Sequence, residues 1–313
     1  MILSVSQRTD IPAYYSEWLM KRLKAGFVDV ANPFNPHLIS RIDLHPQVID
    51  CMMLLTKNPI PMMRYLDELG FPYFFHITLT GFGREIEPHV PDKQNILIPA
   101  IQQLAKKIGR HRIIWRYDPI FINERYSIVY HAHAFETICK ALKDSVHEVI
   151  ISFVDMYEKV ERRSEKWQIR AMSFTQIHEL SEKLGKIAHS YGLKISTCCE
   201  GIDLSLYGIQ KAICIDQKYI EQLIGYEIEA KPWNQREHCD CISVVDIGSY
   251  DTCLHGCRYC YANHEDEKVS KKVRGYDSDS TILCGKITPQ DKIVERRMKS
   301  LRKQQASLFN WME

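Results

Sequence analysis

Over its first two hundred residues the chain alternates short β-rich runs with amphipathic segments, and this alternation limits its possible folds more than any other feature. Such an alternation is typical of a parallel sheet covered by helices. The predicted strands are residues 3–6, 27–31, 51–55, 73–78, 113–117, 149–154, 193–196 and, further along, 242–247. The predicted helices are residues 15–24, 61–69, 96–108, 131–142 and 175–191. Eight strands favour an α/β fold of the TIM-like (βα)8 barrel type, while an open doubly wound sheet would show the same pattern.

The expected organisation has three parts. Residues 1–197 form the barrel body, residues 198–285 a cysteine-rich segment with the last barrel strand and a cluster-binding loop, and residues 286–313 a helical tail packed on the body. The tail has seven basic and two acidic residues between Lys286 and Lys303, which is more typical of an exposed amphipathic helix than of a phosphate-binding patch. A charged stretch at residues 157–170 is either a lid or a solvated helix.

Composition and charge narrow the class of protein. The chain has 313 residues and a net charge of +2, which gives no general argument for binding to nucleic acid or to a membrane. No uncharged apolar run approaches the roughly 18 residues of a membrane span, and the first residues do not resemble a signal peptide. We therefore expect a cytoplasmic protein. Eleven cysteines are many for a reducing compartment, where disulfides are rare, and nine of them follow residue 195.

Polar side chains recur where the predicted strands end. In a parallel α/β fold these carboxyl ends meet on one face, where active sites are built. The predicted catalytic residues are Arg8, Asp10, Lys57, Asn58, Arg116 and Asp118. Arg8 or Arg116 could hold a carboxylate of a cofactor or substrate through two parallel hydrogen bonds. A buried arginine that pairs with an aspartate for structural reasons is an equally good interpretation.

The stretch "CLHGCRYC" places Cys253, Cys257 and Cys260 at the spacing C-x3-C-x2-C. Three thiolates leave a tetrahedral zinc site one ligand short. In an iron–sulfur cluster they would leave one iron open to a further ligand. Such an iron could chelate the amino and carboxylate groups of S-adenosylmethionine (SAM).

This stretch resembles the signature of radical-SAM enzymes, with Tyr259 in the aromatic position. The resemblance implies a 4Fe-4S cluster on the three cysteines, SAM on its open iron, and an external electron donor such as a flavodoxin or ferredoxin. It also implies a 5′-deoxyadenosyl radical that acts on a substrate which the sequence does not identify. Tyr259, Arg8 and Arg116 are the predicted cofactor-binding residues.

The whole chain resembles a bacterial family of unknown function whose C-terminal cysteines are similar to the radical-SAM cluster loop. The matching stretches are "SQRTDIPA", "TKNP", "RYDPI" and "HCDCISVVDIGSYDTCLHGCRYCYAN". Radical-SAM enzymes usually carry the motif near the N-terminus, so the resemblance implies a circular permutation. A strand at residues 242–247 that pairs beside residues 3–6 would produce this arrangement.

Four further cysteines, Cys198, Cys214, Cys239 and Cys241, form a second predicted metal site. Four thiolates complete either a 4Fe-4S cluster or a zinc site, and the alternative is a set of buried thiols. Adjacent side chains on a strand point to opposite sides, so we expect Cys199 to face away from Cys198. The resemblance favours Cys198 as the ligand.

Two functions remain open at this point. The first is a radical-SAM-like enzyme that acts on a small molecule or another unidentified substrate. The second is a zinc- or iron–sulfur-binding redox protein without SAM chemistry. Nucleic-acid binding has little support because the net charge is close to zero.

Overall fold

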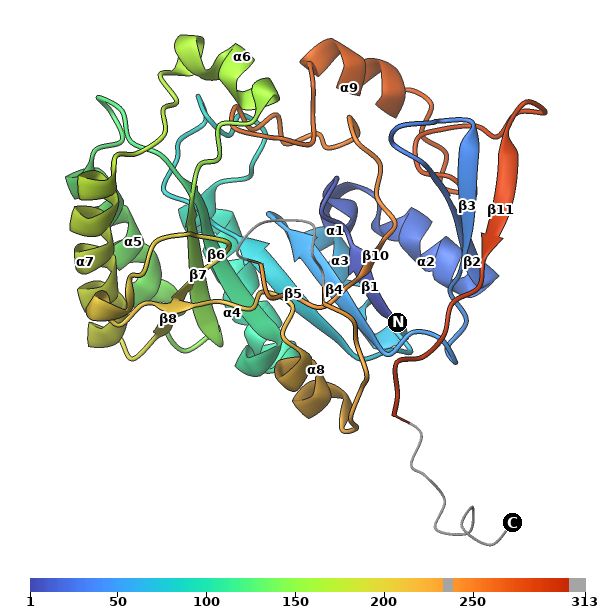
Figure 1. Ribbon diagram of the computed structural model, residues 1–313, viewed down its shortest axis with the longest axis horizontal. Helices are drawn as coiled ribbons and strands as arrows, with labels where there is room; N and C mark the ends of the chain where they lie inside the picture. The colour runs from blue at the N-terminus through green and yellow to red at the C-terminus, as the bar shows by residue number, and fades with distance from the viewer. Residues whose placement is uncertain (233–238, 304–313) are drawn as a thin grey trace, which may run out of the picture.

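The computed structural model describes residues 1–232 and 239–303 (Figure 1). Its strands are β1 (Ile2–Val5), β2 (Phe27–Ala31), β3 (Leu38–Asp43), β4 (Cys51–Thr56), β5 (Tyr73–Thr78), β6 (Ile113–Ile120), β7 (Glu148–Phe153), β8 (Lys194–Thr197), β9 (Gln210–Lys211), β10 (Val245–Asp246) and β11 (Lys292–Arg296). Its α-helices are α1 (Ile11–Tyr14), α2 (Ser16–Ala25), α3 (Ile60–Met63), α4 (Ile98–Ile108), α5 (Ile128–Leu142), α6 (Glu158–Trp167), α7 (Phe174–Ser190), α8 (Gln217–Ile224) and α9 (Asp266–Val273). Short helical turns are η1 (Leu66–Glu68), η2 (Lys93–Leu97), η3 (Arg110–Arg112) and η4 (Ser205–Tyr207).

The main sheet has eight parallel strands in the order β10-β1-β4-β5-β6-β7-β8-β9. From β1 onward the strands follow one another in a single direction across the sheet (Figure 1). The predicted pairing of the late strand beside the first one is confirmed, because Leu3 pairs with Val245 and Ser4 with Asp246. The loop that carries the three cysteines therefore follows the carboxyl end of an edge strand, β10.

The predicted closed (βα)8 barrel is wrong. A barrel requires every strand to pair on both sides, whereas β9 and β10 lie at opposite edges of this sheet. Both edge strands are only two residues long. The chain between them, in its described residues 212–232 and 239–242, packs on the face of the sheet instead of completing a ring. The molecule is thus an open parallel α/β sheet.

The two faces of the sheet have different covers. One face packs against α2, α4, α5 and α7 in the main hydrophobic core, which includes Trp18, Leu104, Phe135 and Leu184. The opposite face buries Ile2, Met53, Phe74, Ile114 and Ile150 against apolar residues of the cysteine-rich segment. In Figure 1 this segment, yellow to orange, passes in front of the sheet. Because alternate residues of a strand point to opposite faces, both faces can be apolar only when both are covered.

Strand β2 was predicted for the main sheet but belongs to a second, three-stranded one. It runs antiparallel to β3, and β11 pairs with β3 in parallel. Arg41 on β3 donates two hydrogen bonds of 2.9 Å to the buried Asp29 on β2. The described part of the tail therefore contains a strand and not the expected helix, because the unpaired edge of β3 offers β11 backbone partners.

Local sequence signals position the long helices. Ser173 caps α7 and forms a capping box with Gln176, as the sequence indicates. Gly26 ends α2 in a left-handed conformation, with φ at 78°. The charged stretch after β7 forms helix α6. Within residues 1–232 and 239–303, we find no helix with the length and apolarity that crossing a membrane requires.

Candidate functional site

The loop after β10 brings together the thiols of Cys253, Cys257 and Cys260, which we call the three-thiol loop. Asn263 donates a hydrogen bond of 2.8 Å to the carbonyl of Cys253, and the amide of Cys260 donates one of 3.1 Å to Cys257. The amide of Ala262 points at the Cys260 sulfur, 3.3 Å away. The loop is therefore folded back on itself around its sulfurs.

Burial favours the protonated form of two of these thiols, Cys253 and Cys257. It raises the pKa of Cys257 to about 12, an increase to which the nearby Glu87 and Cys260 also contribute. It also raises the pKa of Cys253 well above its ordinary value, with further contributions from Asp10, Cys260 and Cys257. The charge of one sulfur therefore affects the pKa of another, which shows that the three sulfurs lie close together. A metal or cluster bound there must displace the thiol protons.

One buried carboxylate, Glu87, anchors the loop from the side of β5. It is 1% exposed and accepts hydrogen bonds from Lys57, Lys93, Thr80 and Tyr259. The Nζ atom of Lys57 lies 2.7 Å from Glu87 and 2.9 Å from the Tyr259 hydroxyl. Burial alone would raise the pKa of Glu87, but Lys57 and Lys93 hold it well below its ordinary range. The network fixes Tyr259, and hence the loop, relative to the sheet.

A second anchor starts at Asp10. Its Oδ2 atom accepts a hydrogen bond of 2.7 Å from the amide of Lys57 and lies 2.8 Å from Nε2 of His255. Its Oδ1 atom caps helix α1 at Ala13. The other ring nitrogen of His255 lies 2.9 Å from the hydroxyl of Tyr14. The carboxylate of Asp10 therefore joins β1, β4 and the three-thiol loop.

Arg116 and Asp118 form an ion pair at the end of β6. The guanidinium donates to Asp118 Oδ2 at 2.9 and 2.5 Å, and Ser152 donates to the other carboxylate oxygen. A third contact, of 3.3 Å, joins Arg116 to the sulfur of Cys214. The charge of Asp118 is also close enough to raise the pKa values of Lys57 and Tyr261. The pair thus lies between the three-thiol loop and the remaining cysteines.

Arg8 is less tightly held than Arg116. Its Nε atom lies 3.8 Å from Asp246, its guanidinium stacks on Tyr250 at 5.4 Å, and its side chain is 25% exposed. Asn58 has a local role, because its side-chain oxygen accepts a hydrogen bond of 3.2 Å from the amide of Ile60 at the start of α3. The structure therefore brings Asp10, Lys57, Arg116 and Asp118 into the surroundings of the three-thiol loop. It directs the side chain of Asn58 to a helix start.

The second predicted set of cysteines also converges, and it includes one cysteine more than expected. The sulfurs of Cys198 and Cys214 lie 2.7 Å apart, and those of Cys198 and Cys199 lie 3.7 Å apart. Cys214 also contacts Cys241, which contacts Cys239, and Cys239 contacts Cys199. We call these residues the five-thiol set. The expectation that Cys199 faces away is wrong, because its φ of 57° takes the chain out of strand geometry directly after Cys198.

Nearby charges and hydrogen bonds give these thiols different pKa values. Hydrogen bonds with Cys199 and Cys214, together with the nearby charge of Arg116, lower the pKa of Cys198 well below its ordinary value. Hydrogen bonds with Cys198 and Cys241, together with burial, raise that of Cys214. The hydrogen bond with Cys214 lowers the pKa of Cys241 to about 7. Within the described ranges, no group of three or more His, Cys, Asp or Glu side chains is placed, in the geometry of this structure, so that it could hold a metal ion.

Two residues near this set belong to the polar residues at the predicted strand ends but were not among the predicted site residues. His76 on β5 is 1% exposed, and burial together with Arg116 lowers its pKa to about 3. Glu200 accepts a hydrogen bond of 2.8 Å from the amide of Phe153. Burial and the charges of Asp155 and Asp118 raise the pKa of Glu200 to about 7, which suits proton transfer near neutral pH. The only sequence signal for either residue was its position near the end of a strand.

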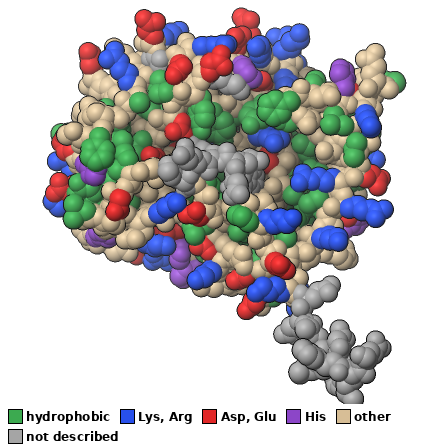
Figure 2. Space-filling view, in the orientation of Figure 1, with side chains coloured by type: hydrophobic (Ala, Val, Ile, Leu, Met, Phe, Trp, Pro, Cys, Tyr) green, Lys and Arg blue, Asp and Glu red, His purple; other side chains and the backbone are tan. Residues whose placement is uncertain are grey.

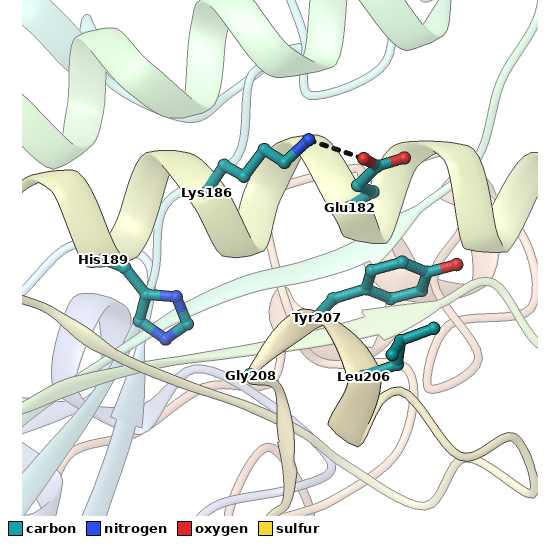
Figure 3. Close-up of a pocket in the computed structure, with 6 residues that line it drawn as sticks. All are labelled: Glu182, Lys186, His189, Leu206, Tyr207 and Gly208. Carbon is teal, nitrogen blue, oxygen red and sulfur yellow. Dashed lines mark hydrogen bonds and ion pairs between the residues drawn. The ribbon is translucent and has the colours of Figure 1, made fainter.

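A surface pocket of about 530 Å³ lies elsewhere, between α7 and η4 (Figure 3). An ion pair of 2.5 Å between Glu182 and Lys186 lies along its helical wall, opposite Tyr207. The residues that line it include none of the predicted site residues. On the face shown in Figure 2, acidic and basic side chains are spread together over the surface. We therefore place the candidate site at the cysteines and not at this pocket.

Comparison with known proteins identifies a family but not an activity. The sequence profile of the family described as "Domain of unknown function (DUF1848)" matches residues 2–262, and the chain belongs to that family. The match includes the three-thiol loop and the five-thiol set. A comparison with curated proteins gives no match.

Proposed function

We propose that this DUF1848 protein is an iron–sulfur enzyme of the radical-SAM type, acting on a substrate that it encloses at the carboxyl ends of its strands. The observation that carries the proposal is the position of Cys253, Cys257 and Cys260. They share one folded loop at the end of a parallel edge strand, and buried ionic networks hold that loop in place.

The donor set fits a 4Fe-4S cluster. Cysteine thiolates are the usual ligands of such clusters, and three of them leave one iron for a ligand that the protein does not supply. When bound, such a cluster supplies the electron that cleaves SAM reductively into methionine and a 5′-deoxyadenosyl radical. The reducing electron would come from an external donor of the flavodoxin or ferredoxin type.

The chain's own residues then position and shield the reactants. Lys57, Glu87 and Tyr259 already satisfy one another, so their role is to hold the loop in one geometry. Arg8 is the better candidate for a carboxylate of SAM or of a substrate, because Arg116 is already committed to Asp118. The buried His255, Cys257 and Tyr259 limit the access of water to one side of the loop.

The five-thiol set supports a second metal centre in the same protein. Thiols gathered from β8, the following segment and the run-up to β10 could bind zinc or a further cluster. The same set favours the alternative function, a metal-binding redox protein without SAM chemistry. Both functions predict metal at the cysteines, and they differ in what happens to SAM.

Anaerobic reconstitution with iron and sulfide, followed by incubation with SAM and dithionite, separates the two functions. The proposed enzyme yields 5′-deoxyadenosine and retains about four irons on the three-thiol loop. The matched control carries Cys253→Ala, Cys257→Ala and Cys260→Ala and should lose that iron together with the product. A protein that holds its iron but leaves SAM intact would be the redox protein.

A further inference from the structure

Neither ring nitrogen of the buried His76 imidazole makes a hydrogen bond of good geometry with a described residue, although the backbone of Cys214 lies near the ring. It lies on the sheet face that the cysteine-rich segment covers, two positions along β5 from Phe74. Its ring is tilted against Phe74 with 5.5 Å between the ring centres. Leaving a buried polar group unpaired destabilises a folded protein. A side chain held in this way requires an explanation, and a missing ligand is one.

The surroundings of His76 are the five-thiol set. Arg116 and Cys198 act electrostatically on the ring, and the backbone of Cys214 is its polar neighbour. Neutral imidazole is the form of histidine that binds metal ions.

Within the five-thiol set, three sulfurs are better placed than the other two. Cys198 and Cys214 are in contact at 2.7 Å, and Cys214 is in contact with Cys241. Arg116 donates to the Cys214 sulfur at 3.3 Å, and the amide of Ile215 donates to the Cys241 sulfur at 3.4 Å. Such donors around a sulfur orient and stabilise a ligating thiolate. The remaining thiols, Cys199 and Cys239, lie on the side of the exposed Lys211.

We propose that His76, Cys198, Cys214 and Cys241 bind one zinc ion as a closed Cys3His site, with Cys239 outside the coordination shell. The inference rests on the proposed second metal centre and identifies its ligands and its metal. Three thiolates and one imidazole make a common structural zinc shell. Binding releases to solvent the protons that the three thiols still carry, and no electron is transferred.

The geometry requires a small adjustment on binding. Two zinc–sulfur bonds of about 2.3 Å at a tetrahedral angle separate their sulfurs by about 3.8 Å. The sulfurs of Cys198 and Cys214 lie 2.7 Å apart and must separate by roughly 1 Å. Bound zinc would thereby join β5, the end of β8 and the segment that crosses the sheet face.

Zinc K-edge X-ray absorption on the full-length, iron-free chain with one equivalent of zinc tests this assignment. We expect three sulfurs at about 2.3 Å and one nitrogen at about 2.0–2.1 Å. His76→Cys should change this shell to four sulfurs and no nitrogen. Cys239→Ser should leave the wild-type shell unchanged, and His76→Leu should weaken zinc binding by more than about tenfold. Circular dichroism of each variant provides the check on folding.

The failures of the two proposals are distinguishable. If Cys214→Ser binds zinc as tightly as the wild type, the five-thiol set holds no metal and the second centre itself is wrong. If Cys214→Ser abolishes binding but the wild-type shell contains four sulfurs, or His76→Cys leaves the shell unchanged, the centre exists and the assignment of His76 is wrong. A disulfide between Cys198 and Cys214 that persists after zinc is added would also overturn it.

Discussion

The three-thiol loop and the five-thiol set are both rich in cysteine, but different interactions assemble them. The loop takes its thiols from eight consecutive residues, and ion pairs with other strands hold it from outside. The five-thiol set takes its thiols from residues 198–241, and only the folding of that segment across the sheet brings them together. A local motif can therefore be recognised before the fold is known, whereas a dispersed site exists only because of the fold.

We expect the largest loss of stability when the Glu87 network, which holds the three-thiol loop in place, is broken. Glu87→Gln leaves the ammonium groups of Lys57 and Lys93 buried without a compensating carboxylate. Breaking a buried pair in this way costs about 3–5 kcal/mol. Urea denaturation should show this loss in the free energy of unfolding. The control Glu182→Gln removes an exposed ion pair with Lys186 and should leave the free energy of unfolding nearly unchanged. Equal losses in the two variants would show that the network does not support the loop.

A loss of stability of similar size is expected outside both cysteine regions, at the buried His131 on helix α5. Nε2 of His131 donates to the carbonyl of Phe121 at 2.9 Å, so Nδ1 accepts from the Tyr117 hydroxyl at 2.8 Å. Burial lowers the pKa of His131 to about 4, below its unfolded value of 6.5. The unfolded chain therefore binds the proton more tightly, and stability falls as the pH drops from 6.5 towards 4. The loss over that window is about 3 kcal/mol.

Denaturation at pH 7.5, 5.5 and 4.5 measures this dependence. His131→Phe removes the titrating group and should flatten the fall in stability relative to the wild type. His133→Gln changes an exposed histidine on the same helix and should leave the fall unchanged. If the wild type and His131→Phe lose stability in parallel, acid sensitivity originates elsewhere.

Arg116 and Arg8 allow the two cysteine regions to be tested separately, because Arg116 contacts the five-thiol set and Arg8 lies near the start of the three-thiol loop. Arg116→Ala leaves Asp118 without its partner in a partly solvated site and should lower the free energy of unfolding by about 2–3 kcal/mol. Arg8→Ala removes a loose ion pair and should cost less than about 1 kcal/mol. Equilibrium dialysis with SAM on the reconstituted protein should show weaker binding for Arg8→Ala. If Arg8→Ala binds SAM like the parent protein, Arg8 is not the carboxylate ligand.

Local sequence patterns predicted most of the main sheet, and long-range packing decided the rest. The pairing of β10 with β1 was expected from the resemblance to radical-SAM enzymes, which implied a circular permutation with the late strand beside the first. Barrel closure failed because it depends on the pairing of two-residue edge strands, which periodicity does not report. Cys199 was misplaced because a single left-handed residue reverses the rule of alternating side chains. His76 was missed because an unpaired imidazole can be recognised only when its neighbours are known.

The smallest expected effect concerns Asn58, which was predicted as a catalytic residue but lies at the start of α3. Its side chain accepts a hydrogen bond from the amide of Ile60, two residues further on, as in an Asx turn, and Pro59 holds the N-cap position. Asn58→Ala should therefore lower the free energy of unfolding by about 1 kcal/mol, the usual contribution of one hydrogen bond. Asn58→Asp keeps the acceptor and should restore most of that loss. Because neither cysteine region depends on this turn, the iron and zinc contents of Asn58→Ala should equal those of the wild type. A catalytic Asn58 would give the opposite result, with stability unchanged and the yield of 5′-deoxyadenosine reduced.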